Sequence, residues 1–269
     1  MTDKIINRYT VPEIFLKKNK SKIVSLSCYT AQFAKIADNH ADIILVGDSM
    51  GMVIYGQKNT LSVTKEMMIE HGKAVVNSTK KALVVIDLPF GSYENSKKRA
   101  FKVSSEILSK TGASAVKLEG GIELADTINY LVERGIPVMG HIGLMPQRIN
   151  IKGKFITQGH SSLEVKKVIT DAKSIASAGV FSMVVEAVKE SLGKKVTNSV
   201  SVPTIGIGAG KYCDGQILVT NDMLGLSNNF TPKFVKKYAN LYSDIDEAIK
   251  KYKNEVLNGK FPSAKNIYN

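Results

Sequence analysis

The sequence predicts an α/β fold, a closed (βα)8 TIM barrel. The chain has 269 residues, close to the roughly 250 that such a barrel needs, so we expect one domain over residues 1–269. Three helical segments are each followed by a glycine and then by an apolar run, at Gly112, Gly135 and Gly179. A glycine in this place is typical of a left-handed helix cap that leads into a strand. Helix, glycine and strand repeated in this order indicate parallel βα units.

Eight apolar runs supply the expected strands. They lie at residues 23–28, 43–48, 83–87, 113–119, 137–141, 183–186, 203–207 and 216–219. Helical patterns lie at 11–18, 31–39, 63–78, 96–110, 123–134 and 163–177. An open, doubly wound sheet is the alternative, because eight sequential units need not close.

The alternation of helix and strand breaks between Gly143 and Gly159. This segment is polar and irregular, so we expect a short inserted loop or hairpin after the fifth strand, lying over the strand ends. The next helix should begin near Ser161, because Ser161 and Glu164 have the spacing of a capping box.

The chain is strongly basic, with a net charge of +13. A polyanionic partner such as nucleic acid is one explanation. The basic residues, however, fall in short groups without interleaved aromatic residues, mostly on expected helices. Solvated helix faces explain this distribution better, so we expect no nucleic-acid partner. The groups are Lys80-Lys81, Lys97-Lys98-Arg99, Lys166-Lys167, Lys194-Lys195, Lys236-Lys237 and Lys250-Lys251.

We find neither a targeting signal nor a functional cysteine pattern in the sequence. Residues 1–20 contain no apolar core of a signal peptide, and no later run approaches the length of a membrane span. We therefore expect a cytoplasmic protein without a membrane partner. The two cysteines, Cys28 and Cys213, lie far apart and predict neither a disulfide framework nor a zinc site. Small buried residues explain them better.

Two opposite charges lie at the end of the strand expected at 113–119. Side chains alternate along a strand, so Lys117 and Glu119 point to the same side. The glycines that follow, Gly120 and Gly121, allow a sharp turn or the close approach of a ligand. The pair indicates either a buried ion pair that only fixes the strand or part of a site.

Other expected strands also end in an acid, which favours a site. Asp48, Asp87 and Glu119 follow the second, third and fourth strands, and their side chains would converge at one side of a barrel mouth. Magnesium prefers oxygen ligands and uses few protein carboxylates, so this set suits a divalent ion with open positions. Glu186 ends the sixth strand, across the mouth, where it could act as a base. A helix cap or loop anchor is the alternative for each acid alone.

Two further motifs are less specific. The glycines in GIGAG at 206–210 lack the third glycine of a dinucleotide fingerprint, because Lys211 stands at its place, and no Lys-Ser or Lys-Thr follows as in a phosphate loop. We therefore interpret them as a close-packed strand end. His141 ends the fifth strand and is a candidate acid, base or substrate contact. A structural hydrogen-bonding role is the alternative for this histidine.

Five segments together resemble the ketopantoate hydroxymethyltransferase family. They are VGDSMG at 46–51, DLPF at 87–90, VKLEGG at 116–121, GHIGLMPQ at 140–147, and IGIGAG at 205–210 with DGQ at 214–216. The resemblance runs in order over about residues 10 to 262. It implies a (βα)8 barrel that converts 3-methyl-2-oxobutanoate to 2-dehydropantoate in pantothenate biosynthesis. One departure is Ala187-Val188-Lys189, which lacks a proline often found there.

The resemblance also implies roles for individual residues. It places the magnesium ligands on Asp48, Asp87 and Glu119. It places the keto-acid contacts on Asp48, Ser49, Asp87 and Lys117, and the proton acceptor on Glu186. Mg2+ is then the cofactor, and 5,10-methylenetetrahydrofolate is the co-substrate that donates the one-carbon unit. The other partners are small-molecule substrates, and the resemblance implies a large homo-oligomer, usually a decamer.

Two other functions remain as alternatives. One is another magnesium-dependent barrel that acts on keto acids, such as a lyase or a phosphonomutase, which would need no folate. The other, from a different class, is a basic nucleic-acid-binding protein, whose binding would weaken steeply with salt.

Overall fold

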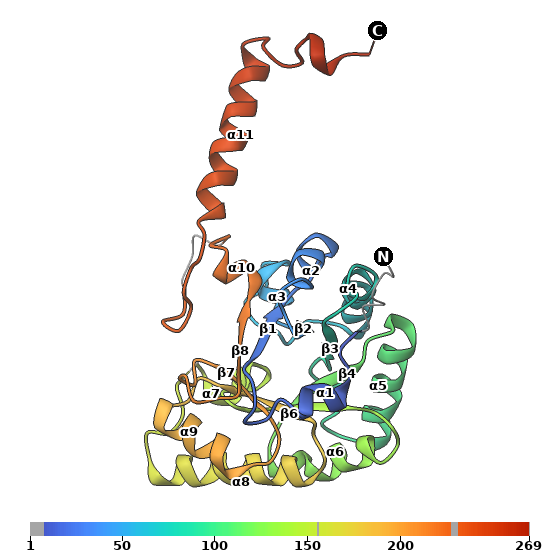
Figure 1. Ribbon diagram of the computed structural model, residues 1–269, viewed down its shortest axis with the longest axis vertical. Coiled ribbons are helices and arrows are strands. Elements are labelled where there is room, and N and C mark those ends of the chain that lie inside the picture. The colour runs from blue at the N-terminus through green and yellow to red at the C-terminus, as the bar shows by residue number, and fades with distance from the viewer. Residues whose placement is uncertain (1–7, 155, 227–230, 269) are drawn as a thin grey trace. The chain divides into compact units, whose positions relative to one another are not determined.

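A computed structural model describes residues 8–154, 156–226 and 231–268. The chain divides into two compact units, one up to Val219 and one from Thr220. The first unit contains eight strands that form a closed parallel barrel in sequence order (Figure 1). The predicted TIM barrel is therefore confirmed, and the open sheet is excluded. That residues 1–269 form one domain stays a prediction.

Each strand pairs in parallel with the next, and the first pairs with the last. The eighth strand, whose pattern is short, closes the barrel through five register pairs with the first. The strands are β1 (Ile23–Ser27), β2 (Ile43–Val46), β3 (Leu83–Asp87), β4 (Ala115–Glu119), β5 (Val138–Gly143), β6 (Ser182–Glu186), β7 (Thr204–Ile207) and β8 (Gly215–Val219).

Helices alternate with these strands, as the sequence predicts. The predicted helices are present as α1 (Val11–Phe15), α2 (Ala31–Ala37), α4 (Lys65–Asn77), α5 (Lys97–Thr111), α6 (Ala125–Val132) and α8 (Ser162–Ser177). The structure adds α3 (Met50–Val53), α9 (Glu190–Ser199) and the 3-10 turn η1 (Ile122–Leu124). One apolar cluster fills the barrel interior, including Ile43, Val85 and Ile205. A larger cluster includes Ile44, Ile86 and Ile107 and packs the sheet against the helices.

The predicted glycine caps and the Ser161 cap are present, but no capping box is formed with Glu164. Gly112, Gly135 and Gly179 have φ of 74°, 82° and 99°, the left-handed region that glycine enters without the steric cost of a Cβ. Ser161 caps α8, because its side chain accepts the N–H of Glu164. The Glu164 carboxylate accepts N–H groups of Gly159 and His160, so it binds the incoming loop.

The predicted insertion follows β5. It contains the 3-10 turn η2 (Pro146–Arg148) and the short helix α7 (Ile149–Lys152). Gln158 forms an isolated parallel bridge with Val188. In the described part of this segment the insertion is a loop with two helical turns, and it contains no hairpin.

The second unit contains α10 (Thr220–Met223), α11 (Leu241–Leu257) and the 3-10 turn η3 (Ala264–Asn266). Helix α11 lies beyond the helical patterns expected from the sequence. Its 17 residues include no buried side chain, and a helix of this kind needs a packing partner to be stable in most proteins.

Candidate active site

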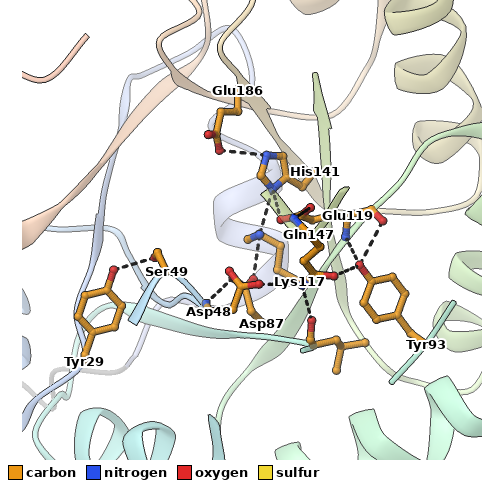
Figure 2. Close-up of polar contacts among 11 residues, drawn as sticks. Tyr29, Asp48, Ser49, Asp87, Tyr93, Lys117, Glu119, His141, Gln147 and Glu186 are labelled. Carbon is orange, nitrogen blue, oxygen red and sulfur yellow. Dashed lines mark hydrogen bonds and ion pairs between the residues drawn. The ribbon is translucent and has the colours of Figure 1, made fainter. Parts of the chain in front are cut away.

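The four predicted carboxylates lie at one rim of the barrel (Figure 2). Asp87, Glu119 and Glu186 are the last residues of β3, β4 and β6, and Asp48 lies two residues beyond β2. Because all strands run in parallel, these strand ends share one rim. Asp48, Asp87 and Glu119 are buried, and the side chain of Glu186 is 17% exposed.

The strands hold two carboxylates next to each other. The backbone N–H of Asp48 donates to Oδ2 of Asp87 at 3.0 Å. This bond connects the loop after β2 to the end of β3, so it fixes the separation of the two side chains. A buried carboxylate needs such partners, because its charge is costly to remove from water.

Lys117 is the buried cation of the site. Its Nζ lies 2.9 Å from Oδ1 of Asp87 and 3.1 Å from Nδ1 of His141. Burial lowers the pKa of Lys117, but Asp87, Glu119 and Asp48 outweigh it and raise the pKa above its ordinary value. Lys117 is therefore an ammonium group that donates hydrogen bonds. The pair of Lys117 and Glu119 predicted from the alternating strand thus lies within a larger charged cluster.

Gln147 connects two of the carboxylates. Its side-chain amide donates from Nε2 to Oδ2 of Asp48 at 2.8 Å, and its backbone N–H donates to Oε2 of Glu119 at 3.0 Å. The same amide also donates to the carbonyl of Leu88 and accepts from the hydroxyl of Tyr93. Gln147 lies in η2, so the insertion after β5 contributes directly to the site.

Three carboxylates share this small volume with one ammonium group. Burial, followed by the charge of Asp87, raises the pKa of Asp48 to about 7. Burial, followed by the charge of Asp48, raises the pKa of Glu119 well above its ordinary value. The cluster therefore has more negative charge than its protein partners neutralise.

His141 lies between this cluster and Glu186. Its Nε2 is 3.3 Å from Oε2 of Glu186, and its Nδ1 is 3.6 Å from Oε1 of Glu119. Burial, and then the charge of Lys117, lower the pKa of His141, so the ring is neutral near pH 7. Glu186 is the most exposed acid of the site, and His141 is its only labelled contact in Figure 2.

The backbone around Glu186 is unusually constrained. Gly143 has φ of 93°, and a Cβ at this position would collide with the carbonyl oxygen of Glu186. Ala187, directly after Glu186, has φ of 46°. A non-glycine residue in this region costs about 1 kcal/mol or more, and such strain is common at functional sites.

Ser49 lies beside the cluster. Its Oγ is 2.8 Å from the hydroxyl of Tyr29, which belongs to the loop after β1. Ser49 and Asp48 are neighbours in the chain, and so the hydroxyl and the carboxylate are presented at the same rim. The structure therefore brings together every residue that the sequence places in the site.

The donor set fits a divalent cation by its chemistry. Its oxygen atoms belong to carboxylates, which Mg2+ prefers, and their excess negative charge is not neutralised within the protein. In residues 8–154, 156–226 and 231–268, however, no three His, Cys, Asp or Glu side chains are grouped so as to enclose an ion as they stand. Lys117 and Gln147 contact one oxygen of each predicted ligand. The magnesium ligands thus stay a prediction.

Three residues of the site, Tyr29, Tyr93 and Gln147, have no role that the sequence patterns predict. Gln147 ends the GHIGLMPQ segment, so the resemblance marked its position without a role. Tyr93 lies six residues beyond Asp87 in a loop, and its local sequence contains no signal for a contact with β4. Only the fold brings its hydroxyl to Gln147.

The glycine segment, the cysteines and the helix lengths can also be compared with the sequence. Ala209, within the glycine segment after β7, is buried, and Gly193 of α9 packs directly on its carbonyl, which confirms a close-packed strand end. Cys28 and Cys213 are buried and form no disulfide. No helix in the described part of the chain has both the length and the apolar character to cross a bilayer.

The fold is similar to that of several solved barrel enzymes. Phosphonopyruvate hydrolase, in complex with oxalate and Mg2+, aligns with a TM-score of 0.62 and 11% identity over 96% of this chain and 93% of that chain. The 2,3-dimethylmalate lyase of the PEP mutase/isocitrate lyase superfamily aligns with a TM-score of 0.60 and 12% identity over 93% and 90% of the two chains. At this identity the likeness concerns the fold alone.

Sequence relatives are much closer. The 3-methyl-2-oxobutanoate hydroxymethyltransferase of Bartonella bacilliformis is 52% identical over 265 residues, 98% of this chain and 97% of that protein. The enzyme of the same name from Rhizobium etli is 49% identical over 97% of this chain and 96% of its own length. The family model for ketopantoate hydroxymethyltransferase matches residues 8–264. The chain therefore belongs to the ketopantoate hydroxymethyltransferase family.

Proposed function

We propose that this enzyme transfers a hydroxymethyl group from 5,10-methylenetetrahydrofolate to 3-methyl-2-oxobutanoate. The products are 2-dehydropantoate and tetrahydrofolate, and the reaction belongs to pantothenate biosynthesis. The membership of the family and the name shared by its relatives support this function. The observation that carries it is the cluster of Asp48, Asp87 and Glu119 around Lys117 at the strand ends.

Asp48, Asp87 and Glu119 would hold Mg2+. When bound, this ion supplies Lewis-acid chemistry that draws electrons from a keto-acid carbonyl. The excess negative charge of the buried carboxylates supports the assignment, because a dication would neutralise it. Lys117 would supply positive charge beside the oxygen on which negative charge develops. Ser49 would donate a hydrogen bond to the keto acid.

Glu186 would remove the proton from C3 of the keto acid. Its carboxylate lies at the rim and is partly exposed, so a substrate bound at the cluster can reach it. The resulting carbon nucleophile then bonds to the one-carbon unit of the folate, and water supplies the hydroxyl oxygen. Both bonds from this carbon to the folate nitrogens break, and the nitrogens take up one proton from the water and the proton that Glu186 removed, so that tetrahydrofolate leaves. Glu186 lies on β6 and Lys117 on β4, and Lys117 forms its ion pair with Asp87. Glu186 is therefore not bound by the ammonium group of Lys117.

One assay separates this function from its alternatives. Product formation from 3-methyl-2-oxobutanoate should require both the folate donor and a divalent ion. A magnesium-dependent lyase or phosphonomutase would turn over its substrate without folate. Retention of duplex nucleic acid at physiological salt would instead support the nucleic-acid-binding alternative. Activity in metal-free buffer at the full rate would remove Asp48, Asp87 and Glu119 from the proposed role.

We also infer that the enzyme is a cytoplasmic homo-oligomer, a decamer as in its family. One face of α11 supports the association. Five apolar side chains recur there at alternating spacings of three and four residues, the pattern of a helix that packs against another element. They are Tyr242, Ile245, Ile249, Tyr252 and Val256, each at least 44% exposed. Light scattering should give ten times the chain mass of 29.3 kDa, and Ile249→Glu should lower the assembled mass.

A further inference from the structure

The side chain of Gln147 is buried, and both its N–H donors and its carbonyl oxygen form hydrogen bonds. Nε2 donates to Oδ2 of Asp48 at 2.8 Å and to the carbonyl oxygen of Leu88 at 2.9 Å. Oε1 accepts from the hydroxyl of Tyr93 at 2.6 Å. An amide has two N–H donors and one carbonyl acceptor, so both ends of this side chain are satisfied. Gln147 therefore occupies one fixed position at the centre of the site.

The direction of each hydrogen bond is determined by its partners. Asp48 in its ionised form and the Leu88 carbonyl can only accept, so they require the N–H end of the amide. The Tyr93 hydroxyl accepts the backbone N–H of Glu119 at 3.1 Å. Its hydrogen has two acceptors, Oε1 of Gln147 at 2.6 Å and the Glu119 carbonyl oxygen at 3.2 Å, and the shorter contact is with Gln147 (Figure 2). A reversed amide would place its oxygen against two acceptors. The network thus allows a single orientation of Gln147.

The network joins the two carboxylates that have no ammonium partner of their own. Lys117 contacts Asp87, whereas Gln147 contacts Asp48 through its side chain and Glu119 through its backbone N–H. Gln147 uses Oδ2 of Asp48 and Oε2 of Glu119, and so leaves the other oxygen of each carboxylate free of this residue. Gln147 is a neutral hydrogen-bond donor to both carboxylates. It lowers the repulsion between them without adding a positive charge that would repel a bound cation.

We propose that Gln147 is a positioning residue that holds Asp48 and Glu119 in place for the divalent cation, and that Tyr93 fixes its orientation. The inference rests on the cation site proposed above. Partners that orient metal ligands in this way typically contribute about 10- to 100-fold to metal affinity. Gln147 and Tyr93 would act through the carboxylates and would not touch the ion.

The test is the affinity of the metal-free protein for Mg2+, measured by isothermal titration calorimetry. Gln147→Met keeps the length of the side chain and removes the amide. It should weaken Mg2+ binding by about 10- to 100-fold. Tyr93→Phe removes a single hydroxyl group and should weaken binding less, but in the same direction. This second variant preserves the test if Gln147→Met does not fold.

Arg148→Met is the matched control. Arg148 lies next to Gln147 in η2, but its guanidinium is partly exposed and pairs with Glu123, away from the cluster. This variant should bind Mg2+ with the affinity of the wild type, which separates the role of the amide from the integrity of the turn.

Two results would overturn the inference. Wild-type affinity in both Gln147→Met and Tyr93→Phe would show that the carboxylates are held by other means. Tighter binding in Gln147→Met would show that the amide competes with the ion for Asp48. If the wild-type protein itself bound no divalent ion, the proposed cation site would fail, and this outcome is distinct from a failure of Gln147 alone.

Discussion

Nε2 of His141 faces Oε2 of Glu186 at 3.3 Å, while Nδ1 of the same ring lies 3.1 Å from the ammonium group of Lys117. An ammonium group can only donate, so Nδ1 accepts and the ring hydrogen is on Nε2. This tautomer places an N–H on the ring nitrogen nearest to Glu186, at a distance that a hydrogen bond can span but without hydrogen-bond geometry in this structure. His141 therefore connects the cation of the site to its proposed base.

Removing this connection should impair positioning of the base more than substrate binding. His141→Phe should lower kcat by about 100-fold, because a small displacement of a catalytic group has an effect of this size. The KM for 3-methyl-2-oxobutanoate should change less. His141→Gln, whose amide can both accept and donate, should recover part of the rate. Equal loss in the two variants in steady-state assays would argue against the hydrogen-bonding role.

Glu186→Gln should abolish exchange of the C3 hydrogen of the keto acid with deuterated solvent. A general base of this kind contributes up to about 10⁴ in rate, near 5.5 kcal/mol, and the amide cannot accept the proton. Exchange is followed by NMR without folate, so that the proton transfer is observed alone. Glu190→Gln, four residues further along the chain in α9, is the control and should exchange normally. Normal exchange in Glu186→Gln would remove it from the role of base.

Magnesium affinity should rise with pH. Asp48 has a pKa of about 7 in the metal-free protein, so below this pH a proton occupies the carboxylate and competes with the ion. Binding near pH 7 should therefore release protons. Calorimetry in buffers of different ionisation enthalpy measures this release, and a dissociation constant independent of pH from 6 to 8 would contradict it.

The raised pKa of Asp48 also predicts how the stability of the metal-free protein depends on pH. The pKa of Asp48 in the folded protein lies above its value of about 4 in the unfolded chain. Ionisation therefore disfavours folding, and the metal-free protein should lose stability as the pH rises from about 4 to 7. Mg2+ should reduce this loss. Thermal unfolding at several pH values, with and without Mg2+, measures both effects.

Ala187 should tolerate glycine better than a branched residue. Its φ of 46° is accessible to glycine without strain, whereas a β-branched side chain is a steric outlier there. Ala187→Val should destabilise the protein by about 1–3 kcal/mol, and Ala187→Gly should have a smaller effect of either sign. Urea unfolding curves compare the two variants. Equal destabilisation would show that the backbone at this position is not strained.

Much of the barrel could be predicted because its signals are local. Apolar runs, the glycine caps and the strand-ending acids each depend on a few neighbouring residues. β3 was predicted with its exact bounds, because Asp87 ends the strand and Pro89 prevents its continuation. Helix α11 lies outside this prediction, because it follows the last strand and is not part of the repeat of helix, glycine and strand on which the barrel prediction rests.

The sequence predicts the acids of the site but not the hydrogen bonds that connect them. Asp48, Asp87, Glu119 and Glu186 stand at strand ends, so topology alone brings them to one rim. The contacts of Gln147 depend on a loop whose path is set by distant packing. Its bond to Asp48 joins residues 99 positions apart in the chain, and no local pattern encodes such a distance.

The missing side chain of Gly143 has a consequence for how this enzyme can evolve. At this one position, any side chain would have to adopt an unfavourable backbone conformation and would also push against the carbonyl of Glu186. The backbone conformation and the contact with Glu186 thus each disfavour a side chain at Gly143. Substitution at this position would therefore be expected to alter the spacing between β5 and β6, which carry His141 and Glu186.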